Sequence, residues 1–143
     1  MDRAPVKRAV SNELKMSPVQ LVLSYYRAVE DGDLNRLQTI MTQDSYAKTI
    51  EAFSFKISFQ DPGFKQLLKK ASEDVTAMKK VESILSDDLK KVHESHEISI
   101  VDTEHNGINR TTVNYRDNGK QKKLYFSFFE GKWLIDYMAG RRV

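Results

Sequence analysis

Two aromatic-rich segments near the C-terminus restrict the possible folds of this chain more than any other feature. They occupy residues 124–137, LYFSFFEGKWLIDY, and are joined by a tight turn at Glu130-Gly131-Lys132. Because side chains alternate between the two faces of a strand, apolar residues fall on both faces. One face carries Leu124, Phe126 and Phe128, and the other carries Tyr125 and Phe129. We therefore expect helices of the same chain to cover one face, and a second molecule or a ligand to cover the other.

Length and composition indicate one domain without thiol chemistry. A chain of 143 residues is long enough to bury a substantial core. It has no cysteine, which excludes disulfides, thiolate metal sites and a cysteine nucleophile. A formal net charge of +3 is too small to indicate nucleic-acid binding unless the charges cluster. The chain has no membrane-length apolar run, so we expect a soluble protein, cytoplasmic, or periplasmic if a signal peptide was removed.

The N-terminal third predicts a charged arm followed by two helices. We assign residues 1–16 to a flexible arm and residues 17–143 to a single α+β domain. Ser17-Pro18 is typical of a helix start, with a capping hydroxyl before a proline in the first turn. Apolar residues then recur at helical spacing up to Gly32, and Asp33 is placed to cap a second short helix.

The middle of the chain contains one ambiguous segment. Apolar and polar residues alternate strictly from Phe53 to Phe59, which favours a strand, although Phe53/Ile57 and Phe55/Phe59 are also neighbours on a helix. We interpret this segment as a strand.

From Phe64 to Val92, near-heptad apolar spacing predicts one long amphipathic helix or two in tandem, with Ser86 as a possible cap for the second. Interleaved lysines and carboxylates give this region a polar, solvated face.

The last third predicts a four-stranded antiparallel meander. Ile98 and Ile100 alternate in the first strand, and a turn at His105-Asn106-Gly107 leads to the second. Asn118-Gly119 tolerates the positive φ angles of a type I′ hairpin turn, and the aromatic pair supplies the last two strands. Helices followed by strands indicate the α+β class, with N-terminal helices packed on a curved antiparallel sheet of about four strands.

Both ends of the chain resemble one known superfamily. Residues 18–41, PVQLVLSYYRAVEDGDLNRLQTIM, look like the opening helices of the nuclear-transport-factor-two-like superfamily, which includes ketosteroid isomerase, scytalone dehydratase and the SnoaL-like polyketide cyclases. The features matched are the aromatics of an apolar helix, an alanine and a Gly-Asp pair: Tyr25, Tyr26, Ala28, Gly32 and Asp33. The closing residues 131–137, GKWLIDY, are similar to the last strand of that fold, and the chain looks closest to a lumazine-binding-like, uncharacterised bacterial branch.

This resemblance implies a cystatin-like cone, in which helices fold over the concave side of the sheet and leave a cavity. Members of the superfamily use such a cavity for catalysis, for ligand binding or for neither, so the fold alone does not select a function. Their catalytic sets are a buried Asp base, an Asp/His pair or an Asp-Arg-Asp cluster. None of these sets can be matched here residue by residue, so no catalytic residue is transferred.

Asp136 is the candidate for general-base chemistry. It shares a strand face with Leu134 and Met138, and a carboxylate in an apolar row has its pKa raised by desolvation. The alternative is that Asp136 lies near solvent or accepts a hydrogen bond from a tyrosine or the backbone.

Histidines and basic residues carry weaker signals. His93, Glu94, His96 and Glu97 form a cluster without a third ligand at a recognisable spacing, so we expect no metal and no cofactor. His105 is expected in a solvated turn. The basic residues near the second hairpin favour a solvated tip over nucleic-acid binding; they are Arg116, Lys120, Lys122, Lys123, Arg141 and Arg142.

Five tyrosines could line a pocket suited to a flat, partly polar ligand, or could simply pack in the core and interfaces: Tyr25, Tyr26, Tyr115, Tyr125 and Tyr137. We expect the pocket residues to be Tyr25, Tyr26, Tyr115, Phe126 and Asp136. The favoured function is a non-enzymatic module that binds a small hydrophobic or aromatic ligand or a protein, as a homodimer. The alternatives are an isomerase or dehydratase with Asp136 as base and a tyrosine as acid, and a secretion or envelope domain whose arm, Met1 to Lys15, binds a partner.

Overall fold

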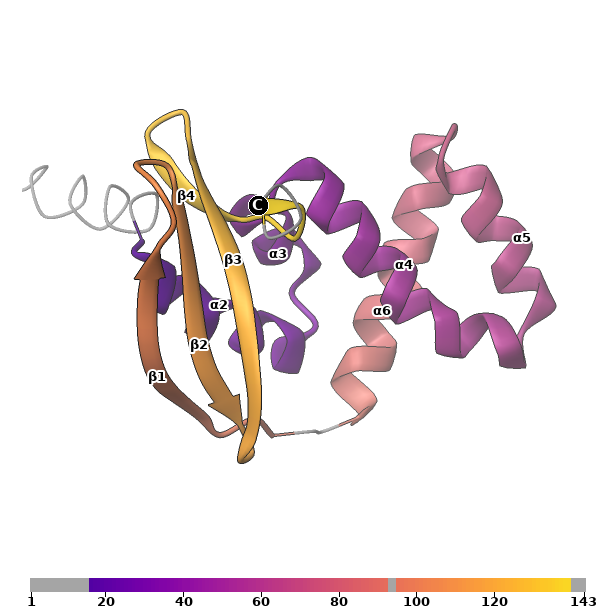
Figure 1. Ribbon diagram of the computed structural model, residues 1–143. Helices are drawn as coiled ribbons and strands as arrows, with labels where there is room; N and C mark the ends of the chain where they lie inside the picture. The colour runs from indigo at the N-terminus through magenta and orange to yellow at the C-terminus, as the bar shows by residue number, and fades with distance from the viewer. Residues whose placement is uncertain (1–15, 93–94, 140–143) are drawn as a thin grey trace, which may run out of the picture.

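The computed structural model describes residues 16–92 and 95–139 and shows an α+β fold in which helices precede a single sheet (Figure 1). The expected fold class is thus confirmed. Within residues 16–92 the helices are α2 (Pro18–Asp31), α3 (Leu34–Ile40), α4 (Gln43–Gln60), α5 (Pro62–Ala71) and α6 (Val75–Val92). The strands are β1 (Ile98–His105), β2 (Arg110–Asp117), β3 (Lys120–Phe129) and β4 (Lys132–Ile135). The arm predicted for residues 1–16 lies outside the described residues except for Met16.

The start of α2 follows the capping chemistry expected from Ser17. The Ser17 hydroxyl accepts a hydrogen bond from the Gln20 N–H at 3.2 Å, and the Gln20 side chain accepts one from the Ser17 N–H at 2.9 Å. This reciprocal pair is a capping box, which satisfies two backbone donors that the first turn of a helix leaves unpaired. Asp33 caps α3 in a similar way, by accepting a hydrogen bond from the Arg36 N–H at 3.1 Å.

Gly32 joins α2 to α6 as well as ending α2. Its φ of +67° is left-handed, and a Cβ at this position would lie 2.6 Å from the Ser86 carbonyl oxygen. The Ser86 hydroxyl donates to the Gly32 carbonyl at 2.6 Å. Glycine is therefore required both by the backbone angle and by the close approach of α6. Ser86 is an interior residue of α6 and does not restart a helix; the tandem alternative holds, with the break at Ser72–Asp74.

The strand interpretation of Phe53–Phe59 is wrong, because this segment belongs to α4. Phe53 and Ile57 face the core, whereas Phe55 and Phe59 pack edge to face with each other at a ring distance of 4.9 Å and remain 66% and 77% exposed. The intervening Ser54 donates its hydroxyl to the Ile50 carbonyl, one helical turn back. Alternation misled the prediction because two interleaved pairs at i and i+4 also produce a period of two.

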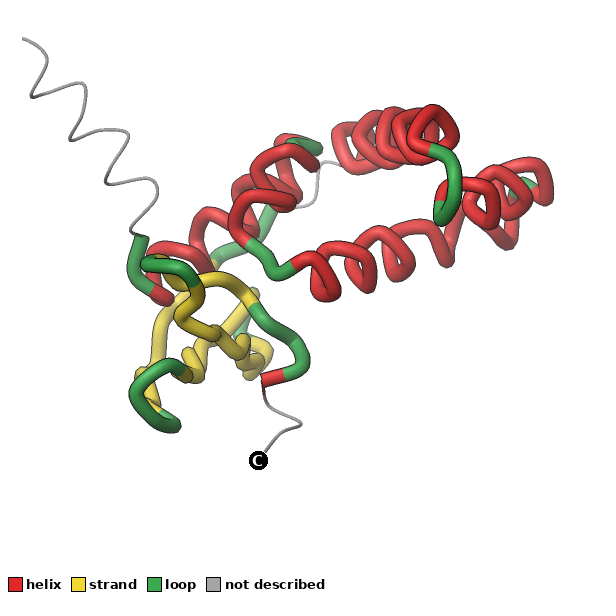
Figure 2. Tube along the Cα trace, turned by 90° about the horizontal axis from the view of Figure 1, so that it is seen from above, coloured by secondary structure: helices red, strands yellow, loops and turns green. Residues whose placement is uncertain are grey.

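The sheet is an antiparallel meander in the order β1-β2-β3-β4. Asn118 and Gly119 have φ angles of +52° and +84°, as expected for a type I′ turn. In the register, Val113 pairs with Leu124 and Phe126 pairs with Ile135, which places these four apolar side chains on one face. Seen from above, the five helices between residues 16 and 92 lie on one side of the sheet (Figure 2).

The two faces of the sheet therefore have different environments. The face toward the helices, here called the inner face, joins the core residues of α2, α3, α4 and α6. The other face, here called the outer face, carries polar groups over β1 and β2, where the Asn114 amide donates to Asp102 and Glu104. Over β3 it carries Tyr125 and Phe129. No helix in the described part of the chain is long and apolar enough to cross a membrane.

Candidate functional site

A cavity of about 380 Å³ lies between α2, α4, α6 and the sheet, and we call it the tyrosine pocket. Its apolar wall consists of Val29, Ala52, Phe53, Leu85, Leu89 and Val92. Its polar groups are Tyr25, Tyr26, Lys56, Asp88, His96 and Lys122. An apolar cavity with a few convergent polar groups is typical of a small-molecule site.

A buried pair of tyrosines forms one end of this site. The hydroxyl oxygens of Tyr26 on α2 and Tyr115 on β2 are 2.6 Å apart, and both side chains are buried. Burial raises the pKa of Tyr26, with a further rise from the hydrogen bond to Tyr115; burial also raises the pKa of Tyr115. Both hydroxyls therefore remain protonated at neutral pH. Since the pair has two protons and uses one internally, one O–H is available to a ligand or a neighbouring group.

A second group of hydroxyls lies near Tyr25. Burial raises the pKa of Tyr25, and the nearby Tyr137 raises it further. The Tyr137 hydroxyl lies 3.2 Å from the Thr49 hydroxyl, which donates to the Ser45 carbonyl at 2.9 Å. Because the Thr49 hydroxyl donates its proton to the Ser45 carbonyl, the Tyr137 hydroxyl is the donor to Thr49. These two hydrogen bonds connect Tyr137 to α4.

Asp117 organises the polar side of the pocket. Its carboxylate, 5% exposed, lies 2.9 Å and 3.1 Å from His96 Nδ1 through its two oxygens and 2.8 Å from Lys122 Nζ. Burial raises the pKa of Asp117, but the hydrogen bonds from Lys122 and His96 outweigh it and leave the pKa lowered. The ionised carboxylate accepts a hydrogen bond from the Nδ1–H of His96; in the neutral imidazole this arrangement leaves Nε2 as an acceptor.

His96 also packs against the tyrosine pair. Its ring centroid is 4.8 Å from that of Tyr26, and its backbone N–H donates to Glu30 at 2.9 Å. The α2 helix thereby fixes both the ring and the backbone of His96. Three kinds of polar group meet here: neutral phenols, an imidazole and a Lys–Asp ion pair.

Of the residues expected in the pocket, the structure brings together Tyr25, Tyr26 and Tyr115. Tyr25 and Tyr26 line the cavity, and Tyr115 reaches it through its hydrogen bond to Tyr26. Phe126 does not line the cavity, contrary to the expectation: it is fully buried in the hydrophobic core, where it pairs with Thr111 and Ile135.

Asp136 lies apart from the tyrosines. Ile135 pairs with Phe126 on the inner face, so the next residue, Asp136, points to the outer face. There its two carboxylate oxygens accept hydrogen bonds from the Ser127 hydroxyl at 2.7 Å and the Met138 N–H at 3.0 Å. With its side chain buried, Asp136 holds the turn that follows β4, which corresponds to the hydrogen-bonded alternative considered from the sequence.

Sequence reasoning missed Asp117, the residue that directly precedes the Asn118-Gly119 turn. The available signal was alternation: Val113, Tyr115 and Asp117 share one strand face, which predicts a carboxylate beside the tyrosine. Lys122 was grouped with the hairpin lysines, although its register opposite Tyr115 directs it to the same face.

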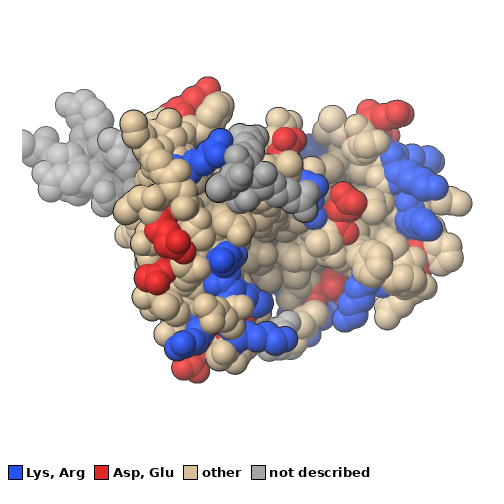
Figure 3. Space-filling view, viewed as in Figure 1, with Lys and Arg blue, Asp and Glu red and all other residues tan. Residues whose placement is uncertain are grey.

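The remaining sequence candidates are placed as follows. His93 and Glu94 lie outside the described residues, and no group of three potential metal ligands occurs among those that the structure describes. His105 Nδ1 lies 3.3 Å from the Thr111 hydroxyl. Arg141 and Arg142 also lie outside the described residues. On the face seen in Figure 3, lysines and arginines are scattered among acidic side chains over both the sheet and the helices.

Comparison with protein-family models, with curated proteins and with solved structures gives no match. The fold and the tyrosine pocket therefore define an α+β domain with a cavity between its helices and its sheet.

Proposed function

We propose that this protein binds a small, flat, partly polar ligand in the tyrosine pocket, and that the chain belongs to the nuclear-transport-factor-two-like superfamily, in its lumazine-binding-like branch. The observation that carries the binding proposal is the meeting of the Tyr26–Tyr115 hydroxyl pair, His96 and Lys122 at one apolar cavity. The apolar wall accepts a ring, and the polar end fixes its orientation through a carbonyl or hydroxyl group. The helices on one side of a four-stranded antiparallel sheet, with a cavity between the two layers, support the superfamily assignment.

A fragment screen tests the binding proposal. Small aromatic acids, phenols and ketones are screened by ligand-observed NMR against the wild type, Tyr26→Phe and Tyr125→Phe. Tyr125 is the matched control because it lies on the outer face. We expect fragments that bind the wild type to bind Tyr26→Phe about tenfold more weakly, since a buried hydrogen bond is lost. Absence of binding, or equal binding by both variants, contradicts the proposal.

The second candidate is proton transfer in the same pocket, of the isomerase or dehydratase type. The observation that favours it is the geometry of His96 and Asp117, in which both carboxylate oxygens lie within 3.1 Å of Nδ1. In this version His96 Nε2 acts as the base, Asp117 orients it, and a tyrosine hydroxyl is the acid. Asp136, the base expected from the sequence, faces the other side of the sheet.

Hydrogen–deuterium exchange tests the enzymatic candidate. Ketone fragments found to bind are incubated with the protein in D₂O, and exchange at the carbon next to the carbonyl is followed by NMR. Exchange that is faster with the wild type than with His96→Gln supports the candidate. Equal rates with both proteins leave ligand binding as the function.

We also propose that two copies associate through the outer face of β3 and β4. Helices cover the inner face, whereas Phe129 on the outer face is 54% exposed. An aromatic side chain in a partly apolar strand pair is suited to the centre of an interface.

A further inference from the structure

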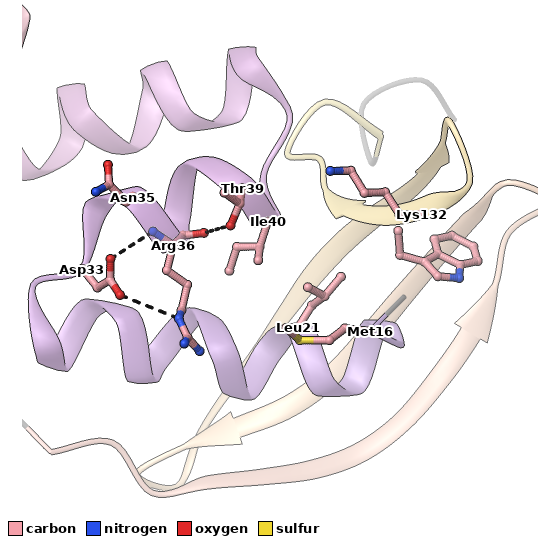
Figure 4. Close-up of a pocket in the computed structure, with 9 residues that line it drawn as sticks. Met16, Leu21, Asp33, Asn35, Arg36, Thr39, Ile40 and Lys132 are labelled. Carbon is pink, nitrogen blue, oxygen red and sulfur yellow. Dashed lines mark hydrogen bonds and ion pairs between the residues drawn. The ribbon is translucent and has the colours of Figure 1, made fainter. Parts of the chain in front are cut away.

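A second cavity, of about 310 Å³, lies between the start of α2, α3 and the β3–β4 hairpin (Figure 4). We call it the α3–β4 pocket. Its apolar residues are Met16, Leu21, Ile40 and Trp133, and its cationic residues are Arg36 and Lys132. None of these six residues lines the tyrosine pocket, so the two cavities are separate sites.

The apolar residues of this pocket are held in place by packing contacts. Leu21 on α2 and Ile40 on α3 are buried core residues, and Figure 4 shows Ile40 above Leu21 with Met16 beside them. Trp133 is half-buried and packs at 67° against Phe128, with a ring distance of 5.2 Å. These contacts fix the wall before any ligand arrives, which lowers the entropic cost of binding.

Arg36 is weakly engaged for a residue at a cavity wall. Among the described residues its guanidinium lies 3.8 Å from the Asp33 carboxylate and 3.5 Å from the Ser24 hydroxyl, both at the limit of a polar contact. Asp33 is held instead by the N–H of the Arg36 backbone at 3.1 Å, as the cap of α3. An exposed ion pair this long contributes little, so an incoming anion would displace almost nothing.

The charges of the pocket favour an anion. The cavity is lined by two cationic residues, Arg36 and Lys132, and by one carboxylate, Asp33. In Figure 4 Arg36 reaches from α3 toward α2, and Lys132 comes from the hairpin on the other side of the apolar residues. A guanidinium presents paired N–H donors that match the two oxygens of a carboxylate.

We propose that the α3–β4 pocket binds a small amphipathic carboxylate, with its apolar body against Leu21, Ile40 and Trp133 and its carboxylate on Arg36. Lys132 adds attraction from the opposite side. This site is independent of the tyrosine pocket and of the function proposed there.

The single tryptophan of the chain makes the site directly observable, because Trp133 lines it. Phenylacetate is titrated into the full-length protein, and tryptophan fluorescence gives the Kd. Phenylacetamide, of the same shape without the charge, is the matched ligand control. We expect phenylacetate to bind about tenfold or more tightly than phenylacetamide, because charge-assisted hydrogen bonds are the stronger ones.

Two variants assign the charge contact. Arg36→Gln should weaken phenylacetate binding about tenfold and leave phenylacetamide binding unchanged. Arg27→Gln is the matched control, since Arg27 is exposed on α2 and lines neither cavity; it should bind phenylacetate as the wild type does. Circular dichroism confirms that both variants are folded.

Three results would overturn the proposal: no fluorescence change with phenylacetate, equal affinity for phenylacetamide, or an unchanged Kd in folded Arg36→Gln. The outcome is distinguishable from that of the tyrosine pocket, because Tyr26→Phe should leave the fluorescence titration unchanged.

Discussion

The hydroxyl oxygens of Tyr26 and Tyr115 lie 2.6 Å apart although 89 residues separate them in the chain. This contact joins the first described helix to the second strand, at the wall of the tyrosine pocket. Because burial opposes ionisation of both phenols, the contact is a hydrogen bond between neutral groups. It therefore links the stability of the fold to the chemistry of the site.

The tyrosine pair should show a strong coupling in a double-mutant cycle. Tyr26→Phe or Tyr115→Phe leaves the other hydroxyl without its partner in a buried place, so each should lower the free energy of unfolding by about 1–3 kcal/mol. The double variant removes both polar groups and should cost less than the sum of the single changes. Urea unfolding measures all three, and Tyr125→Phe, a control on the outer face, should stay within about 0.5 kcal/mol of the wild type. Additive losses would mean that the hydroxyls do not interact.

Asp117 should make stability depend on acidic pH. Its pKa is lowered in the folded protein, so folding favours its ionised form. This contribution is present above the unfolded pKa of about 3.9 and is lost as pH falls through the lower folded value. Urea unfolding should therefore show that the free energy of unfolding of the wild type is well above that of Asp117→Asn near neutral pH. The difference between the two free energies should shrink below about pH 4. A difference that stays constant down to the acid transition would contradict the assigned ion pair.

Buried tyrosines should resist ionisation until the protein unfolds. Burial raises the pKa of Tyr25, Tyr26, Tyr46 and Tyr115, four of the six tyrosines in the chain. A raised folded pKa contributes stability that is present below the unfolded pKa of about 10 and is lost as pH rises above it. Alkaline titration followed by tyrosinate absorbance should show these four ionising together with the loss of circular dichroism. If all six tyrosines ionised while the protein was still folded, the burial of these four would be contradicted.

The exposed pair on α4 offers a test of the corrected segment. Phe55→Lys should change the free energy of unfolding by no more than about 0.5 kcal/mol, because Phe55 is on the solvent side of a helix. Ile50→Ala, in the core of the same helix, should cost about 2–5 kcal/mol. Thermal or urea unfolding separates the two. If Phe55→Lys were as damaging as Ile50→Ala, the helical assignment of this face would fail.

Local signals in the sequence were sufficient for the elements whose residues interact with near neighbours. Ser17, Asp33 and the Asn118-Gly119 turn act within a few residues, and the structure confirms their predicted roles. Phe53–Phe59 was ambiguous because its spacing satisfies both periods, and only tertiary packing selects the helix.

The site was less predictable because it depends on strand register. The sequence predicted that both Asp136 and Phe126 line the pocket. Because Phe126 pairs with Ile135 on the inner face, the next residue, Asp136, lies on the outer face. The same register brings Lys122 beside Tyr115, and the interaction of His96 with Asp117 spans 21 residues. No short motif encodes contacts of this kind.

The final prediction concerns self-association. The described helices lie on the inner side of the sheet and leave the outer face of β3 and β4 uncovered (Figure 2). Phe129 is 54% exposed there, and a two-fold pairing would bury on the order of 1,200–2,000 Å² if it forms a stable interface. Light scattering at micromolar concentration should give twice the monomer mass of 16.5 kDa, and Phe129→Lys should return it to the monomer value. Phe55→Lys, an exposed aromatic on the helical side, is the matched control and should remain dimeric. A wild-type mass of 16.5 kDa would refute the homodimer, while a dimer lost in Phe55→Lys and retained in Phe129→Lys would move the interface from the sheet to α4.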